Sequence, residues 1–293
     1  MSNASHRVIV LLAAYNGMAF IEEQLQSILK QKCVDVTVFI SVDLSSDGTY
    51  EWCSDYAQHN HRINVLPYGE KFGGAAPNFY RLIRDVDFSK VDYVALSDQD
   101  DIWLEDKLIT ACKQIEKKSI DGYSSNVRAF WDSGREILIN KAQPQRKYDY
   151  LFEAAGPGCT YVMRKKPLSE FKQILISEKQ QANQVTLHDW FIYAFFRVNG
   201  YQWFIDPDYK MRYRQHDGNQ IGINKGWKAR FKRFTLMRSG WYKQQILNIS
   251  RLIGVQSSIL NSRWDALKNI NQTRRKWQDR IWLFFIVLVG MLN

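Results

Sequence analysis

Short apolar runs alternate with amphipathic stretches over the first 117 residues of the chain. The runs at 8–14 and 36–42 are continuous and rich in β-branched residues, which is typical of strands covered on both faces. Between them, Ile21, Leu25 and Ile28 recur at helical spacing. The predicted strands are 8–14, 36–42, 62–66 and 93–96, and the predicted helices are 21–29, 49–58, 79–86 and 102–117. This order predicts an α/β fold with a mostly parallel, doubly wound sheet flanked by helices.

The pattern changes after residue 126. Beyond it, the predicted elements are strands at 126–131, 136–140, 159–163 and 201–205 and one apolar helix at 187–198. From residue 223 onward the sequence is helix-rich, basic and aromatic. We therefore predict two parts, a main α/β domain over residues 1–222 and a helical C-terminal extension over residues 223–293.

The composition is typical of a folded protein from a reducing compartment. With 45% hydrophobic residues, 24% charged residues and only 6 prolines in 293 residues, a disordered or collagen-like chain is excluded. The 4 cysteines lie far apart without a Cys-x-x-Cys pair, so no zinc knuckle, redox motif or disulfide scaffold is indicated. Residues 1–7 are polar and the apolar run after them is short, so no signal peptide is expected.

The net charge of +10 is concentrated in the last third of the chain. Residues 1–200 carry 23 basic and 25 acidic side chains, whereas residues 201–293 carry 17 basic and 5 acidic ones. This excess predicts a polyanionic neighbour, either nucleic acid or an anionic membrane surface. Trp227, Phe231 and Phe234 share one predicted helical face among lysines and arginines, which suits a helix that lies in a membrane interface.

A second apolar segment follows the basic residues Arg274, Arg275 and Lys276. It consists of 12 consecutive apolar residues at 281–292. As a helix it would span roughly 18 Å, which is less than the ~30 Å hydrocarbon core of a bilayer. We expect an interfacial anchor that does not cross the membrane alone. Two alternatives are that these side chains pack on the main domain or a second subunit, and that the run belongs to a longer transmembrane segment.

Three predicted strands end in loops rich in polar groups. These loops are 14–17, 43–49 and 97–101, and in a parallel sheet they share one edge, where ligands bind. Carboxylates that crowd together are costly unless a cation lies among them. Asp98-Gln99-Asp100-Asp101 therefore favours a Mg²⁺ or Mn²⁺ site that holds a diphosphate. The alternative is that these carboxylates simply cap a helix beginning near residue 102.

Other phosphate-binding and hydrolytic motifs are missing from the sequence. It contains no G-x-x-x-x-G-K-[ST], no G-x-G-x-x-G after the first strand and no G-x-S-x-G elbow. The sequence therefore does not support a P-loop NTPase, a dinucleotide-binding enzyme or an α/β-hydrolase. The remaining interpretation is a site in which a metal and carboxylates hold a nucleotide.

The motifs together resemble the family 2 glycosyltransferases of GT-A fold, and within them the rhamnosyltransferase-type enzymes of bacterial surface polysaccharide assembly. Seven motifs match in family order across about residues 7–222, where a single one would be weak. They are Ala13-Ala14-Tyr15-Asn16-Gly17, Asp43 with Ser45-Ser46-Asp47-Gly48-Thr49, Gly73 with Asn78-Phe79, Asp98-Gln99-Asp100-Asp101-Ile102-Trp103 with Lys107-Leu108, Gly158-Cys159-Thr160, His188-Asp189-Trp190, and Tyr213-Arg214-Gln215-His216 with Asn219.

The resemblance implies a site for a nucleotide-sugar donor and a metal. Tyr15 and Asp43 would hold the base, Asp43 by accepting the N3 hydrogen of uracil or thymine. Asp100 and His216 would bind Mn²⁺ or Mg²⁺ between the two phosphates. The residues implied in donor binding are Ala13, Tyr15, Asn16, Asp43, Asn78, Asp98 (near the ribose), Gln99 and Asp101.

The resemblance also implies an inverting transfer with Asp189 as the general base. Asp189 would take the proton of an acceptor hydroxyl as its oxygen attacks the anomeric carbon. The alternative is that Asp189 only caps a helix, and a tight turn explains Gly158 equally well. The residues expected in the sugar and acceptor pocket are Gly158, Cys159, Thr160, His188 and Trp190.

Donor and acceptor are less sharply indicated. The motifs around Asp100 and Asp189 look most like enzymes that use dTDP-rhamnose, while UDP-linked hexoses and N-acetylhexosamines stay open. The family often has two consecutive acidic residues after the second strand, whereas Val42 and Leu44 flank Asp43 here. The expected acceptor is a glycan or lipid-linked saccharide, and the expected location is the inner face of the bacterial cytoplasmic membrane, reached through the extension. A homo-oligomer stays open.

Three rival functions fit the sequence less well. A nucleic-acid-binding module is disfavoured because the carboxylates would repel phosphates without a metal. A nucleotidyltransferase would need a glycine-rich, basic loop where Tyr15-Asn16-Gly17 stands. An inactive scaffold is disfavoured by the presence of Asp100, Asp189 and His216 together.

Overall fold

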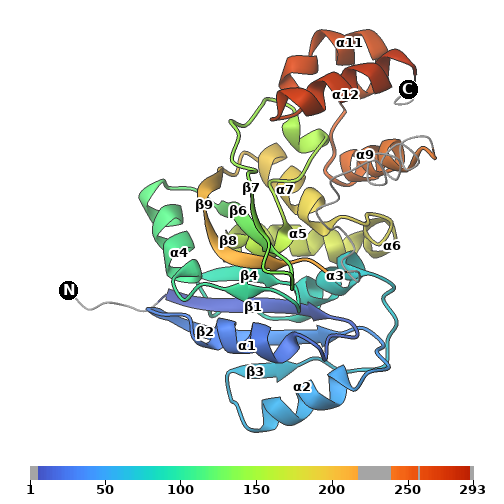
Figure 1. The fold of residues 1–293 in the computed structure, drawn as a ribbon. Coiled ribbons are helices and arrows are strands. Elements are labelled where there is room, and N and C mark those ends of the chain that lie inside the picture. The colour runs from blue at the N-terminus through green and yellow to red at the C-terminus, as the bar shows by residue number, and fades with distance from the viewer. Residues whose placement is uncertain (1–5, 217–238, 257, 291–293) are drawn as a thin grey trace.

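The computed structural model describes residues 6–216, 239–256 and 258–290, which fold around one central sheet (Figure 1). Its strands are β1 (His6–Ala14), β2 (Val34–Val42), β3 (Ile63–Val65), β4 (Tyr93–Ser97), β5 (Ile102–Trp103), β6 (Gly122–Phe130), β7 (Glu136–Ile139), β8 (Val162–Arg164) and β9 (Trp203–Arg214). These form a nine-stranded sheet in the order β3-β2-β1-β4-β8-β6-β9-β5, with β7 paired to β6. β1 to β4 are parallel to one another, and β8 opens a mixed half in which β6 and β9 are parallel again.

Helices cover both faces of this sheet, as the α/β pattern predicts. They are α1 (Ile21–Leu29), α2 (Thr49–Gln58), α3 (Ala75–Asp85), α4 (Lys107–Lys117), α5 (Lys165–Ser177), α6 (Lys179–Ala182) and α7 (His188–Val198). The alternation along β1 explains the two layers. Val8, Val10 and Leu12 join the core formed with α1 and α4, whereas Ile9 and Leu11 join the core formed with α3, α5 and α7. None of the five is more than 3% exposed, as expected for a strand buried on both faces.

The prediction of one helix over 102–117 is wrong at its start. Ile102–Trp103 forms β5 and pairs with Arg212 and Met211 of β9, while α4 begins only at Lys107. The partner strand lies far along the chain, and local propensity does not reveal such a pairing. The carboxylates of 98–101 therefore precede a strand, which excludes the alternative that they only cap a helix.

Two later strands differ from their predicted bounds. β9 runs from Trp203 to Arg214, well past the predicted end at residue 205, because it pairs with β6 on one side and β5 on the other. The predicted strand at 159–163 begins instead as a 3-10 turn, η2 (Gly158–Thr160), followed by β8. The long β9 is what carries Arg214 and the residues after it back to the acidic loop.

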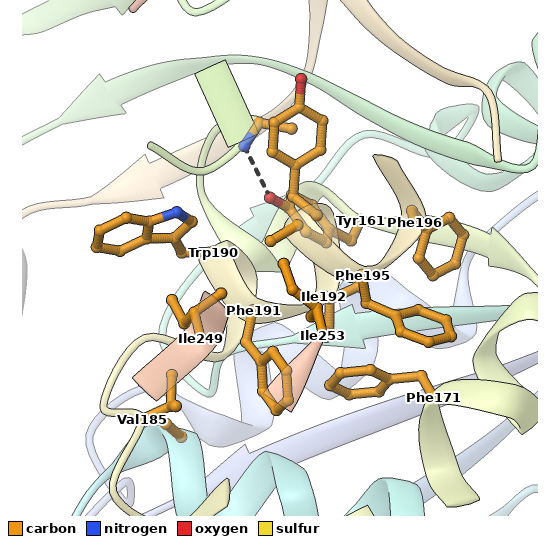
Figure 2. Close-up of a cluster of buried hydrophobic side chains, with 14 of the residues drawn as sticks. Tyr161, Phe171, Val185, Trp190, Phe191, Ile192, Phe195, Phe196, Ile249 and Ile253 are labelled. Carbon is orange, nitrogen blue, oxygen red and sulfur yellow. Dashed lines mark hydrogen bonds between the residues drawn. The ribbon is translucent and has the colours of Figure 1, made fainter. Parts of the chain in front are cut away.

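The described residues after 238, which we call the C-terminal arm, are helical. They comprise α9 (Trp241–Leu252), α10 (Ser258–Asn261), α11 (Arg263–Lys268), the 3-10 turn η3 (Ile270–Gln272) and α12 (Trp277–Leu288). Ile246, Ile249 and Ile253 belong to the same core as α7, and Figure 2 shows Ile249 and Ile253 among the buried aromatic side chains of that core. The predicted boundary at residue 222 therefore divides the sequence but not the hydrophobic core.

Two arginines tie the arm to the main domain. Arg275, whose side chain is 1% exposed, pairs with Asp149 (3.3 Å, Nη1 to Oδ2) and with Glu153 (3.5 Å, Nη2 to Oε2). Arg274 pairs with Glu153 (4.0 Å, Nη2 to Oε2) and, within the arm, donates a hydrogen bond to the hydroxyl oxygen of Tyr242 on α9 (3.0 Å). The charges of these two arginines, which precede the predicted anchor in the sequence, are thus engaged inside the protein by neighbouring carboxylates and Tyr242.

Not every prediction for the extension falls on described residues. Trp227, Phe231 and Phe234 lie outside them, so their predicted interfacial helix stays a prediction. Among the helices that the structure describes, none is long and apolar enough to span a bilayer.

Candidate active site

Side chains tie the loops after β1, β2 and β4 together at one edge of the sheet. Tyr15 N–H donates to Gln99 Oε1 (2.6 Å), and Gln99 Nε2 donates to the Tyr15 carbonyl oxygen (2.8 Å). Asn16 N–H donates to Ser45 Oγ (3.0 Å), and Asn16 Oδ1 accepts from Ser46 N–H (2.9 Å). This confirms the shared edge expected of parallel strands. Gln99 holds the backbone of Tyr15, whose residue surface is 55% exposed.

Asp43 supports a neighbouring loop. Its Oδ1 accepts from Phe72 N–H (2.7 Å) and its Oδ2 from Gly73 N–H (2.9 Å), and the residue is only 4% exposed. A carboxylate oxygen has a second lone-pair direction. The predicted contact with a nucleotide base stays a prediction beside this observed role.

Asn78 and Ala13 lie beneath the edge. Asn78 is 2% exposed, and its Nδ2 donates to the carbonyl oxygens of Ala14 (3.3 Å) and Ser41 (3.0 Å), while Ala13 is 8% exposed. These positions hold the ends of β1 and β2 together. Direct contact of either residue with a donor stays a prediction.

Asp98, Asp101 and Cys159 form a compact acidic cluster whose ligand atoms all lie within 4.8 Å of one another. Burial and the nearby Asp100 carboxylate raise the pKa of Asp98 to about 7 and raise the pKa of Asp101 well above its ordinary value. Burial and the same carboxylates raise the pKa of the Cys159 thiol, which therefore keeps its proton. Because Mg²⁺ and Mn²⁺ prefer oxygen ligands to sulfur, Cys159 is a poor ligand for either ion.

Asp100 pairs instead with His216. Its Oδ2 lies 2.8 Å from His216 Nε2, and the His216 ring packs on Phe20 with 4.8 Å between centroids. Carboxylate oxygen suits Mg²⁺ and Mn²⁺, and imidazole is a common ligand of divalent metals. One carboxylate and one imidazole this close can share a cation, so the donor set fits a divalent metal and leaves positions for diphosphate oxygens.

Two basic residues that had no predicted role flank these carboxylates. Arg214 N–H donates to Asp101 Oδ1 (3.1 Å), Arg214 Nε donates to the Asp100 carbonyl oxygen (2.9 Å), and its guanidinium pairs with Glu23. Lys107 is 1% exposed, with Nζ 3.3 Å from the Trp103 ring centroid, and burial lowers its pKa to about 7. Both residues stand inside motifs quoted above, and that position was their only sequence signal.

Asp189 lies in the first turn of α7, whose N-cap residue is Leu187. Its Oδ1 accepts from the N–H of the next residue, Trp190 (2.8 Å), and no side chain caps this helix, so the alternative that Asp189 is the N-cap is wrong. Burial raises the pKa of Asp189 to about 6, against the opposing effects of the Trp190 N–H and Lys141. The charge of Asp189 in turn raises the pKa of Asp98, which places the two carboxylates in one electrostatic site.

His188 and Gly158 pack tightly beside this carboxylate. A Cβ atom on Gly158 would lie 2.4 Å from His188 Nε2 and 3.3 Å from Asp189 Cβ. This close approach, and not a left-handed turn, requires glycine there. The His188 ring stacks on Phe79 (4.1 Å between centroids), burial lowers its pKa to about 3, and Nε2 finds no hydrogen-bond partner among the described residues.

Trp190 and Thr160 adjoin Asp189 and Gly158 in the sequence, and both are buried. Trp190 is 2% exposed, its indole N–H donates to the Tyr150 carbonyl oxygen (2.8 Å), and its ring stacks on Tyr242 of α9 (5.5 Å between centroids). Thr160 is fully buried and its Oγ1 donates to the Pro157 carbonyl oxygen (2.7 Å). Their observed roles are structural, and direct contact with a sugar stays a prediction.

Comparison with known proteins agrees with this arrangement. The profile of Glycosyl transferase family 2 matches residues 9–171. The dTDP-rhamnosyl transferase RfbG of Shigella flexneri is 44% identical over 288 residues, which cover 96% of this chain and 100% of that protein.

Solved structures show the same fold at low identity. The Staphylococcus aureus TarS fragment 1–349 in complex with UDP has a TM-score of 0.57 at 14% identity, covering 90% of this chain and 72% of that one. The mannosyltransferase PcManGT of Pyrobaculum calidifontis, in complex with GDP-Man and Mn²⁺, has a TM-score of 0.54 at 15% identity, covering 99% and 82%.

The profile spans more than half of the chain, and a curated relative aligns along nearly all of it. The candidate site lies at the carboxyl ends of the parallel strands, where open α/β sheets bind their ligands. The chain therefore belongs to glycosyltransferase family 2 and is a glycosyltransferase of GT-A fold.

Proposed function

We propose that the enzyme transfers L-rhamnose from dTDP-rhamnose to a hydroxyl of a saccharide acceptor during assembly of a bacterial surface polysaccharide. The observation that carries the donor is the 44% identity to a dTDP-rhamnosyl transferase over 96% of the chain. The geometry of the site supports the chemistry, because Asp189 on α7 lies against Gly158, and the next residue, Cys159, clusters with Asp98 and Asp101 after β4.

Asp189 is the general base in this proposal. With a pKa of about 6, its carboxylate is ionised at neutral pH and basic enough to accept a proton in the transition state. The acceptor oxygen forms its bond to C1 of the sugar while the bond from C1 to the diphosphate oxygen breaks. The hydroxyl proton goes to Asp189 and the electron pair leaves with dTDP. Attack from the face opposite the leaving group inverts the anomeric configuration.

Asp100 and His216 would hold the divalent cation, Mn²⁺ or Mg²⁺. When bound, such an ion neutralises charge on the departing diphosphate. Arg214 supports this assignment, because its contacts with the Asp100 carbonyl oxygen and the Asp101 carboxylate fix the loop that carries the metal ligand. Tyr15 and Asp43 would face the base of the nucleotide, and Asp98 would face its ribose.

The acceptor in this proposal is a lipid-linked or free glycan at the inner face of the cytoplasmic membrane. The charge balance supports that location, because residues 201–293 carry 17 basic and 5 acidic side chains. An anionic lipid surface attracts such a segment.

The test is transfer of radiolabelled sugar into the lipid fraction of a polysaccharide-producing bacterium. dTDP-rhamnose and UDP-glucose are compared with Mn²⁺, with Mg²⁺ and with a chelator, and Asp189→Asn serves as the control. Label should enter the lipid from dTDP-rhamnose, only with metal and only with the unmodified enzyme. Preferential transfer from UDP-glucose would overturn the donor, and transfer from neither donor by folded protein would overturn the proposal.

A further inference from the structure

The outer side of α12 is apolar almost throughout. On this helix and the residue after it, the exposed large apolar side chains include Trp277, Ile281, Trp282 and Phe285, at 47% to 59% exposure, while Leu283, Ile286 and Val287 face inward. The neighbouring α11 exposes Trp264 to 70%. We call this set the aromatic face, and its members are Trp264, Trp277, Ile281, Trp282, Phe284, Phe285, Leu288 and Val289.

This density of exposed apolar groups is unlike the remaining described surface. Of 14 exposed large hydrophobic residues, 8 belong to the aromatic face. The other 6 either line the candidate site, as Tyr15 does, or lie on scattered elements, as Leu138 and Ile176 do. A helix that is apolar on nearly all sides is ordinarily buried, and contiguous exposed patches mark interaction surfaces. The aromatic face therefore needs a covering environment.

The composition and the charges around the aromatic face select a lipid interface. Three of its eight members are tryptophans, whose indole rings suit the boundary between headgroups and hydrocarbon. Arg263, Lys268, Lys276 and Arg280 lie on or beside the same two helices, against the acids Asp265 and Asp279. A short helix with aromatic and aliphatic groups beside cations binds anionic lipid while lying flat in the interface.

The position of the arm suits such docking. Figure 1 shows α11 and α12 side by side at one end of the molecule, away from the strand β3 and the helix α2 at the other. Behind them, Arg275 pairs with Asp149 and Glu153 of the main domain. Asp149 also pairs with Arg197 of α7 (2.8 Å). A surface that held the arm would thus hold the helix that carries Asp189.

We infer that the aromatic face of α11 and α12 docks the enzyme on an anionic bilayer, lying in the headgroup region without crossing it. The inference rests on the proposed function in one respect, since it names the surface by which the enzyme reaches a lipid-linked acceptor. The anchor that the sequence predicts at 281–292 is thereby extended to α11, while Arg274 and Arg275, which precede it, hold the arm to the main domain.

The experiment is flotation with phosphatidylcholine vesicles that contain or lack phosphatidylglycerol, at low and at physiological salt. The variant Trp277→Ser/Phe285→Ser removes two exposed rings, and Ile176→Ser on α5 is the matched control, because Ile176 is 51% exposed outside the arm. We expect the unmodified enzyme and the control to float with the anionic vesicles and the double variant to bind roughly 10-fold more weakly.

Two further measurements keep the outcomes distinct. Calorimetric titration with dTDP and Mn²⁺ should give equal affinities for all three proteins, so a failure of the proposed donor would show there and not in flotation. Light scattering after size exclusion reports the oligomeric state. The inference is overturned if the unmodified enzyme does not bind anionic vesicles, if the double variant binds them equally well, or if the aromatic face proves to hold a second copy that the double variant releases.

Discussion

The active-site edge and the C-terminal arm each carry side chains in an unusual environment, and the most prominent ones are of opposite kinds. At the edge these are buried polar atoms, among them Asp101 Oδ2, Lys107 Nζ and His188 Nε2, which find no hydrogen-bond partner within the described residues. In the arm they are apolar rings such as those of Trp264 and Trp277, which stand in the open.

The difference agrees with the roles proposed above for the two regions. Burying polar groups without partners costs stability, and a chain that tolerates this at one edge keeps those groups for a polar ligand. Exposing a dense apolar face has a matching cost in water. In the arm, the guanidinium of Arg275 pairs with both Asp149 and Glu153, although its Nε atom and that of Arg274 find no hydrogen-bond partner within the described residues. The feature that sets the arm apart is its exposed apolar face.

The largest expected effect is the loss of turnover when Asp189, the proposed general base, is replaced. Asp189→Asn keeps the shape of the side chain but cannot accept a proton, so turnover should fall by ~10² to 10⁴. Because burial disfavours the ionised carboxylate, the melting temperature at neutral pH should not fall below that of the unmodified enzyme. Initial rates and thermal melts check both statements. A folded variant with nearly full activity would remove Asp189 from the mechanism.

The next largest effect concerns the stability that the buried ion pairs of Arg275 provide. Arg275→Met leaves Asp149 and Glu153 with less compensation, so the free energy of unfolding should fall by about 3 kcal/mol. The matched control is the neighbouring Lys276→Met, for which a change within about 0.5 kcal/mol is expected. Urea unfolding of the whole protein measures both. Equal losses of unfolding free energy for the two variants would mean that the buried ion pairs of Arg275 contribute no more to stability than a side chain on the outer surface of the arm.

A smaller effect tests the packing beside the base. Gly158→Ala would place a Cβ atom 2.4 Å from His188 Nε2, so the imidazole must move, at a cost of roughly 1 to 3 kcal/mol. Adding His188→Ala should recover much of that cost, and the coupling in a double-mutant cycle measures the contact directly. Additive losses would mean that Gly158 is needed for some other reason.

The smallest effect is the pH dependence. Below its pKa of about 6, Asp189 is protonated and cannot act as a base, so kcat/KM should fall about tenfold per pH unit on the acidic side and level off above it. The acidic limb should be absent in Asp189→Asn, which assigns it to this carboxyl group. A limb centred near pH 4 would contradict the burial that raises this pKa.

The sequence predicts the first half of the molecule well because its signals are local. The run Val8 to Ala14 predicts β1, and the loops after β1, β2 and β4 follow from strand order. Pairings across long separations leave no local trace. Ile102 and Trp103 become a strand only because β9 lies beside them, and nothing near Arg275 in the sequence indicates its ion pair with Asp149.

The candidate site divides in the same way. The motif around Asp100 and the distant His216 was expected to form a pair, and the structure brings them to 2.8 Å. The contacts of Arg214 and the proximity of the Cys159 thiol to two carboxylates could not be derived from spacing, since they depend on how β9 and η2 cross the sheet. The residue types of a motif indicate which chemistry a site can perform, whereas the contact partners and protonation states of its side chains depend on the fold.

The most direct test of the central claim is calorimetric titration of dTDP and UDP, with and without Mn²⁺, into the unmodified enzyme and Asp100→Ala. The account predicts that dTDP binds more tightly than UDP, that the binding requires Mn²⁺, and that Asp100→Ala weakens it. Binding that ignores both the metal and the substitution would contradict the metal site, and the absence of binding by either nucleotide in well-folded protein would contradict the donor site as a whole.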